Sequence, residues 1–205
     1  MDEKTESGAP HCQGRLKELY DLIEALQRNL YFLGVISSLF FGVRFCMQWW
    51  QSEKEGRSVV NKTFWQLSIW GNLSLALHGA FQFQWPIALL QGAQAVLAKR
   101  NLELMREERA PIKTVYYQLI LTLLFLSLLT ISLSYLKGEW EWMRVPSTPW
   151  SEKGHEVSQL WEILGVFGLL LFSSRFFVQW WETERLGESH LSPTFWSVSL
   201  IGAFY

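Results

Sequence analysis

Long apolar stretches alternate with polar segments along this chain of 205 residues. A helix needs about 20 residues to cross the hydrocarbon core of a bilayer, and several of the apolar stretches reach or approach that length. The first of them contains a single charged side chain, Arg44. The pattern predicts an all-α integral membrane fold with membrane-spanning helices at residues 30–50, 63–81, 85–102, 114–136 and 160–181.

The N-terminal region differs from the rest. Residues 1–14 are polar and rich in charge, and we expect them to be disordered. Residues 15–29 carry apolar side chains at helical spacing beside charged ones, which predicts an amphipathic helix lying on the membrane surface. The start of the chain lacks the basic and then apolar pattern of a cleaved signal peptide.

One sequence pattern occurs twice at a constant offset of 131 residues. Over residues 33–72 and 164–203, about 18 of 40 positions are identical, far more than chance gives. The shared residues include Arg44 and Arg175, each of which places a guanidinium inside an apolar helix. The first copy contains Arg44, Phe45, Gln48, Trp49, Trp50, Glu53, Gly56, Ser58, Thr63, Phe64, Trp65, Ser68 and Gly71, and the second contains Arg175, Phe176, Gln179, Trp180, Trp181, Glu184, Gly187, Ser189, Thr194, Phe195, Trp196, Ser199 and Gly202.

This duplication predicts a specific architecture. We expect two tandem three-helix repeats joined by one linker helix, a 3+1+3 arrangement in which the linker restores the second unit to the orientation of the first, so that the repeats are parallel. The last repeat is truncated, since only about 12 residues of its second helix are present, and we expect a longer native protein. The predicted units are residues 1–29, a polar start with the amphipathic helix; 30–104, the first repeat; 105–160, a connector containing the linker helix at 114–136; and 161–205, the incomplete second repeat.

Composition supports a membrane location. The chain has 12 Trp residues, and they gather near the ends of the apolar runs, as expected for aromatic belts at the headgroup level. A Trp-rich soluble core is the alternative, but it would require charges spread evenly through the helices. Lys and Arg residues near the helix ends favour an N-terminus outside the cytoplasm.

Other classes of function receive no support from the composition. The formal net charge of −1 does not favour a nucleic-acid partner. The two cysteines, Cys12 and Cys46, lack metal-ligand spacing. We find no phosphate-binding loop and no nucleophile motif, and so we assign no catalytic residue, metal site or cofactor.

The duplicated arginines are the main candidates for chemistry. Arg44 lies about 9 Å below Trp50 at 1.5 Å per residue, and an intramembrane charge usually has a function. A planar guanidinium can donate two parallel hydrogen bonds to a phosphate. The alternative is that the side chains extend to the headgroups. We predict a substrate or phosphate site, with each arginine paired to the glutamate nine residues on, formed by Arg44, Gln48, Glu53, Arg175, Gln179 and Glu184.

Polar side chains on the second and third helices suggest a cavity for a solute. Its predicted lining consists of Trp65, Ser68, Asn72, Gln91 and Gln94. The alternative is that these groups hydrogen-bond helices to one another, which is common among polar residues of membrane helices.

The motif that begins at Arg44 and ends at Gly71, followed by Gln91-Gly92 and Arg100-Asn101-Leu102, resembles the lipid A biosynthesis N-terminal domain family. The family occurs in Gram-negative bacteria, alone or ahead of the glycosyltransferase domain of lipid-A-disaccharide synthase. The three-helix unit is also similar to PQ-loop and SemiSWEET-type transporters. Ser192-Pro193-Thr194 has the proline of such a loop, whereas Asn61-Lys62-Thr63 does not.

The resemblance implies a role in the transfer of a sugar from a nucleotide donor to an acylated glucosamine phosphate. We expect a multi-pass protein of the bacterial inner membrane that anchors or presents this substrate and contacts membrane lipids, lipid A precursors and a C-terminal or separate glycosyltransferase domain. Such a piece carries no catalytic domain of its own, so its status as an enzyme is left open. Two alternatives remain: a transporter or flippase of sugars or lipid-linked sugars, and a structural subunit without a substrate.

Overall fold

The computed structural model describes residues 9–56, 60–106, 113–137, 158–187 and 193–203, and the regular structure in these ranges is entirely helical. The helices are α1 (Ala9–Asn29), α2 (Phe32–Glu55), α3 (Lys62–Phe81), α4 (Trp85–Leu104), α5 (Thr114–Lys137), α6 (Gln159–Leu186) and α7 (Pro193–Ala203).

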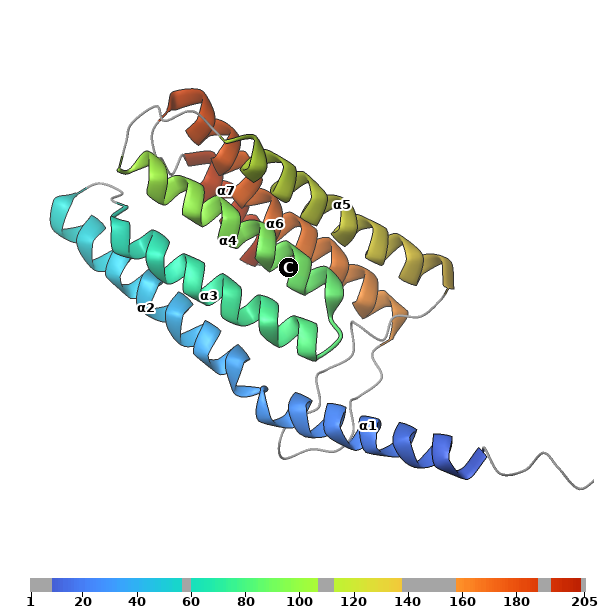
Figure 1. Ribbon diagram of the computed structural model, residues 1–205. Helices are drawn as coiled ribbons and strands as arrows, with labels where there is room; N and C mark the ends of the chain where they lie inside the picture. The colour runs from blue at the N-terminus through green and yellow to red at the C-terminus, as the bar shows by residue number, and fades with distance from the viewer. Residues whose placement is uncertain (1–8, 57–59, 107–112, 138–157, 188–192, 204–205) are drawn as a thin grey trace, which may run out of the picture.

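The first helix begins earlier than the sequence pattern predicts. We expected disorder up to residue 14, whereas α1 starts at Ala9; residues 1–8 lie outside the described ranges. Pro10 is compatible with this start because proline is tolerated in the first turn of a helix, where no backbone donor is lost. Figure 1 shows α1 extending away from the bundle beyond the start of α2.

Glycines end the first helix of each repeat. The helix α2 continues past the predicted end at residue 50 to Glu55 and ends at Gly56, which has a φ of 62°. In the second copy, α6 ends at Gly187, with a φ of 74°. Both angles are left-handed, a conformation that glycine adopts without steric cost. Asn61 caps α3, since its side chain accepts a hydrogen bond from the Phe64 amide at 2.8 Å.

The helix α4 lies at the centre of the bundle. It contacts α3 on one side and α5 and α6 on the other, while α2 packs on α3 and α7 packs on α6. Figure 1 shows this order, with α2, α3 and α4 side by side and α5, α6 and α7 beyond α4. Parts of the chain that are far apart in sequence therefore meet along α4.

Three helical stretches of the described residues are long and apolar enough to cross a membrane: Lys17–Glu55, Thr114–Lys137 and Ile163–Leu186. The predicted spans at 63–81 and 85–102 form α3 and α4 but are not in this set. Their polar residues, such as Asn72 and Gln94, are buried. A helix that faces protein on several sides does not need the uniformly apolar surface that lipid contact requires.

Close packing between α2 and α3 depends on Gly71. A Cβ atom at Gly71 would lie 2.7 Å from Cε1 of Phe41, too close for van der Waals contact. We expect Gly71→Ala to lower the free energy of unfolding by about 1 to 2 kcal/mol, because the Phe41 ring has to move in a packed interface. Titration of SDS into mixed micelles, followed by circular dichroism, measures this change.

The matched control is Gly42→Ala on α2, where nothing lies within 4 Å of the added Cβ. Alanine favours helix over glycine, so this variant is expected to be neutral or slightly stabilising. Equal losses in the two variants would contradict the packing explanation.

Candidate functional site

Each duplicated arginine lies among aromatic rings. The Cζ atom of Arg44 is 4.9 Å from the ring centroids of both Phe41 and Phe64. The Cζ atom of Arg175 lies 3.5, 4.6 and 5.6 Å from the centroids of Phe172, Phe176 and Phe195 respectively. Since Phe172 and Phe195 are the repeat equivalents of Phe41 and Phe64, both copies build the same cationic site. Attraction between a guanidinium and ring faces lowers the cost of holding the charge there.

Hydrogen bonding satisfies these arginines only in part. Nη1 of Arg44 donates to Oγ of Ser68 at 2.9 Å, and that hydroxyl in turn donates to the carbonyl of Phe64 at 2.6 Å. Within the described residues, the Nε atoms of Arg44 and Arg175 are buried without a hydrogen-bond partner. Each guanidinium therefore keeps donor capacity that a bound anion could use.

The two arginines border the same apolar core, since Arg44 lies over Phe64 and Arg175 over Phe176 and Phe195. Neither arginine forms a salt bridge with an acidic side chain among the described residues. In this core, Phe64 and Phe195 come from equivalent positions of the two sequence repeats. A positive charge without an acidic partner in an apolar environment is a candidate site for an anion.

The sequence prediction paired each arginine with the glutamate nine residues later, and this pairing is wrong for Arg175. The partner of Glu184 is Arg100 of α4, whose Nε and Nη2 atoms donate to the two carboxylate oxygens at 2.7 and 2.9 Å. Positions nine apart on a helix point in opposite directions and lie about 13 Å apart along the axis. The same separation directs Glu53 away from Arg44: Glu53 is exposed, and Arg44 donates to Ser68 instead.

The Arg100–Glu184 ion pair joins α4 to α6 in a geometry with two parallel hydrogen bonds. The Arg100 side chain is only 1% exposed and that of Glu184 is 24% exposed. Nε1 of Trp180 also donates to Glu184 at 3.1 Å. The buried, charge-assisted pair of Arg100 and Glu184 fixes the position of α6 on α4. Between α4 and α5, Glu103 accepts a hydrogen bond from the hydroxyl of Tyr116.

A pair of amides lies one turn away in the same interface. Nε2 of Gln179 donates to Oδ1 of Asn101 at 2.7 Å and to Oγ1 of Thr183 at 2.8 Å, and Nδ2 of Asn101 donates back at 3.4 Å. Gln179, Asn101 and Thr183 are each completely buried. Gln179 therefore contributes to helix packing, while its repeat equivalent Gln48 is buried with an Nε2 atom that has no partner in the described residues.

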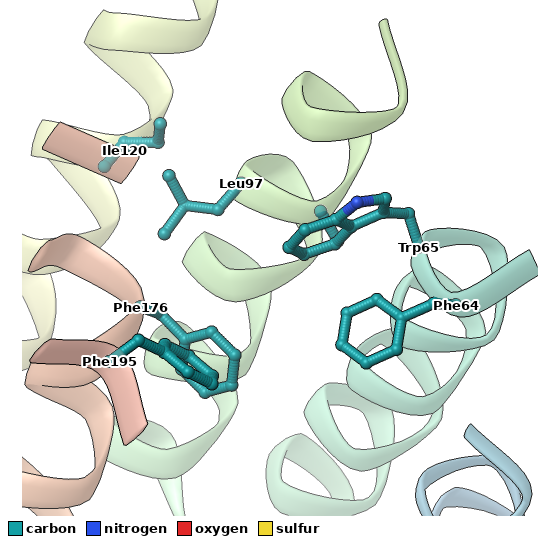
Figure 2. Close-up of a cluster of buried hydrophobic side chains, with 7 residues drawn as sticks. Phe64, Trp65, Leu97, Ile120, Phe176 and Phe195 are labelled. Carbon is teal, nitrogen blue, oxygen red and sulfur yellow. The ribbon is translucent and has the colours of Figure 1, made fainter. Parts of the chain in front are cut away.

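The predicted cavity-lining residues divide between several environments. Trp65 packs into the apolar core with Phe64, Leu97 and Ile120, and Figure 2 shows it approaching from α3 toward Leu97 of α4. Ser68 holds Arg44, and Gln94 donates to Oγ of Ser173 at 3.4 Å. In the described part of the chain, Oδ1 of Asn72 and Oε1 of Gln91 are buried without partners. The solute cavity itself stays a prediction.

Sequence reasoning missed Arg100 and Asn101 as structural partners. The sequence analysis named them only as part of the motif that resembles the family, because neither residue shares a local motif with Gln179 or Glu184. An arginine and an asparagine within an Ala- and Leu-rich run indicate polar contacts, but they do not indicate which helix those contacts reach.

The sequence of this chain is similar to one protein family and to several named proteins. A family model described as the Lipid A Biosynthesis N-terminal domain matches residues 33–103 and 164–205. Proteins named lipid-A-disaccharide synthase are similar to most of the chain. The protein of Chlamydia abortus is 37% identical over 179 residues, which is 87% of this chain, and that of Chlamydia felis is 39% identical over 175 residues, which is 85% of this chain. The protein of Chlamydia pneumoniae is 32% identical over 174 residues, which is 84% of this chain. The chain spans 28% of the length of each of these relatives. No solved structure gives a significant match.

Proposed function

Because this chain belongs to the Lipid A Biosynthesis N-terminal domain family, we propose that it is the membrane domain of a lipid A biosynthesis protein of the lipid-A-disaccharide synthase type. In this role it crosses the bacterial inner membrane several times and presents an acylated sugar phosphate for glycosyl transfer. The transfer itself would be performed by a glycosyltransferase domain, either joined to it or separate.

The observation that carries this proposal is the pair of arginines, Arg44 and Arg175. Their Nε atoms are buried without hydrogen-bond partners in the described residues, and aromatic rings lie against both guanidinium groups. We propose that a phosphate accepts hydrogen bonds from these guanidinium groups and neutralises their charge. The acyl chains of the same molecule would remain in the surrounding lipid.

The proposed architecture follows the internal repeat. The first unit comprises α2, α3 and α4; α5 is the linker; and α6 and α7 begin the second unit, as a 3+1+3 arrangement requires. Equivalent arginines from the two units then approach the same place, as Phe64 and Phe195 do in the core. A ligand site at the junction of two repeats is a common arrangement in duplicated membrane proteins.

Binding of a phosphorylated glycolipid tests the proposal. The protein in nanodiscs would be titrated with fluorescent diacylglucosamine 1-phosphate. We expect Arg44→Gln and Arg175→Gln each to weaken binding by about tenfold or more, since a hydrogen bond to a charged group contributes about 1.5 to 3 kcal/mol. The control ligand is the same diacylglucosamine without its phosphate, which should bind weakly to every variant.

Arg28→Gln is the control variant, because Arg28 is an exposed cation that pairs with Glu24 on α1 at 3.0 Å. If all three variants bind the phosphorylated glycolipid equally well, the proposed phosphate site is wrong. Movement of the labelled glycolipid between leaflets of protein-containing vesicles, lost in Arg175→Gln, would instead favour the transporter alternative.

A further inference from the structure

The internal repeat allows one helix face to be compared in two environments. On α6, the residues Ser173, Phe176, Trp180 and Glu184 follow one another at helical spacing and form a single face. Their equivalents on α2 are Gly42, Phe45, Trp49 and Glu53, which we call the α2 face. Positions separated by three, four and four residues lie on the same side of a helix.

In the second repeat this face is covered by α4. Ser173 is 2% exposed and Phe176 is 7% exposed. Ser173 accepts a hydrogen bond from Gln94, and Glu184 pairs with Arg100. The face therefore recognises a helix with an arginine near its end and a polar amide further along.

In the first repeat the α2 face is open. Phe45 is 63% exposed and Trp49 is 61% exposed, and Gly42 and Glu53 are exposed as well. The face also differs from a surface that contacts lipid. The exposed residues of α5 include neither a glycine nor an acidic side chain, whereas the α2 face combines a glycine, which permits close helix approach, with a carboxylate.

We propose that the α2 face binds a membrane-spanning helix with the chemistry of α4, supplied as the third helix of the second repeat unit. The inference rests on the repeat architecture proposed above but not on the phosphate site. An arginine of the incoming helix would pair with Glu53 as Arg100 pairs with Glu184. Small residues in its middle would pack on Gly42 and Phe45, as Ala-rich α4 packs on α6.

A second observation supports this occupant. Gln48 is 7% exposed, and its Nε2 atom has no hydrogen-bond partner among the described residues. Its equivalent Gln179 bonds to Asn101, the neighbour of Arg100. An incoming Arg-Asn pair would thus satisfy Glu53 and Gln48 together. The α4 of a second copy is a poorer candidate, because α6 of its own chain already occupies the face that carries Arg100 and Asn101.

Photo-crosslinking in nanodiscs tests the inference. The 205-residue chain would carry p-benzoylphenylalanine in place of Phe45, and the probe would be a biotinylated peptide with the sequence of residues 85–106. We expect capture of the peptide at position 45 to exceed capture at position 43 by about tenfold. Val43 is exposed on a different side of α2 and serves as the matched position. The same substitution at Phe176 reports whether the peptide displaces α4.

The pairing of charges gives a second measurement. Glu53→Gln in the chain, or glutamine in place of the arginine corresponding to Arg100 in the peptide, should reduce capture about three- to tenfold. Combining Glu53→Arg with a peptide carrying glutamate at that position should restore it. Capture of another copy of the chain instead of the peptide, capture at position 176 alone, or equal capture at positions 43 and 45 would each overturn the proposal.

Discussion

Replacement of Glu184 by glutamine is expected to lower the free energy of unfolding by about 2 to 3 kcal/mol. The change removes the carboxylate that accepts two hydrogen bonds from Arg100, a side chain only 1% exposed, while the carboxylate of Glu103 lies further away, at 4.0 Å. Breaking a buried ion pair costs about 3 to 5 kcal/mol when both groups are enclosed, and the 24% exposure of Glu184 reduces this. SDS titration in mixed micelles measures the loss, which should be accompanied by separation of α6 from α4.

The repeat provides a matched control for this prediction. Glu53→Gln makes the same chemical change at the equivalent position of α2, where the carboxylate is exposed, and is expected to change the stability by less than about 0.5 kcal/mol. The double variant Arg100→Met/Glu184→Met should recover most of the lost stability, since an apolar pair removes both charges. Similar losses for Glu184→Gln and Glu53→Gln would show that the pair does not hold the helices together.

Truncation of Trp65 is expected to have a comparable or larger effect. Trp65 is 2% exposed and is in edge-to-face contact with Phe64 at 4.9 Å between ring centroids. It packs in the core that joins α3, α4 and the second repeat (Figure 2). We expect Trp65→Ala to destabilise the fold by about 3 kcal/mol or more, because the indole leaves a cavity that the surrounding helices fill only in part.

Trp70 on the same helix is the control for this variant. It is 60% exposed, so Trp70→Ala should cost less than about 1 kcal/mol. Because phenylalanine fills more of the space left by the indole than alanine does, Trp65→Phe should retain more stability than Trp65→Ala. If Trp65→Ala behaved like Trp70→Ala, Trp65 would not be part of the core, and the prediction that it lines an open cavity would gain support.

The two repeats show how one motif can serve two purposes. Arg44 and Arg175 each lie against the equivalent pair of rings, Phe41 and Phe64 in one copy and Phe172 and Phe195 in the other, so the shared motif determines this part of the cationic site. Gln48 and Gln179 differ, because the second finds Asn101 on a neighbouring helix. A duplicated sequence therefore repeats the contacts within each helix pair. The contacts between helices of different units depend on which helix packs beside each copy.

The amino-acid sequence by itself determined the helices, most of their ends and the internal repeat. Apolar runs of sufficient length produce helices wherever they occur, and Gly56 and Gly187 end them because only a left-handed residue fits there. The same local rules placed Arg44 and Gln48 on one helix face.

Tertiary structure alone decided which charges meet. Glu184 pairs with Arg100, 84 positions away, instead of the arginine on its own helix, because residues nine apart face opposite directions. It also decided that Phe176 is buried while Phe45 is exposed, although both stand in the same motif. Helical periodicity fixes the direction of a side chain relative to its own axis, but burial and pairing depend on how separate helices pack, and that information is spread along the whole chain.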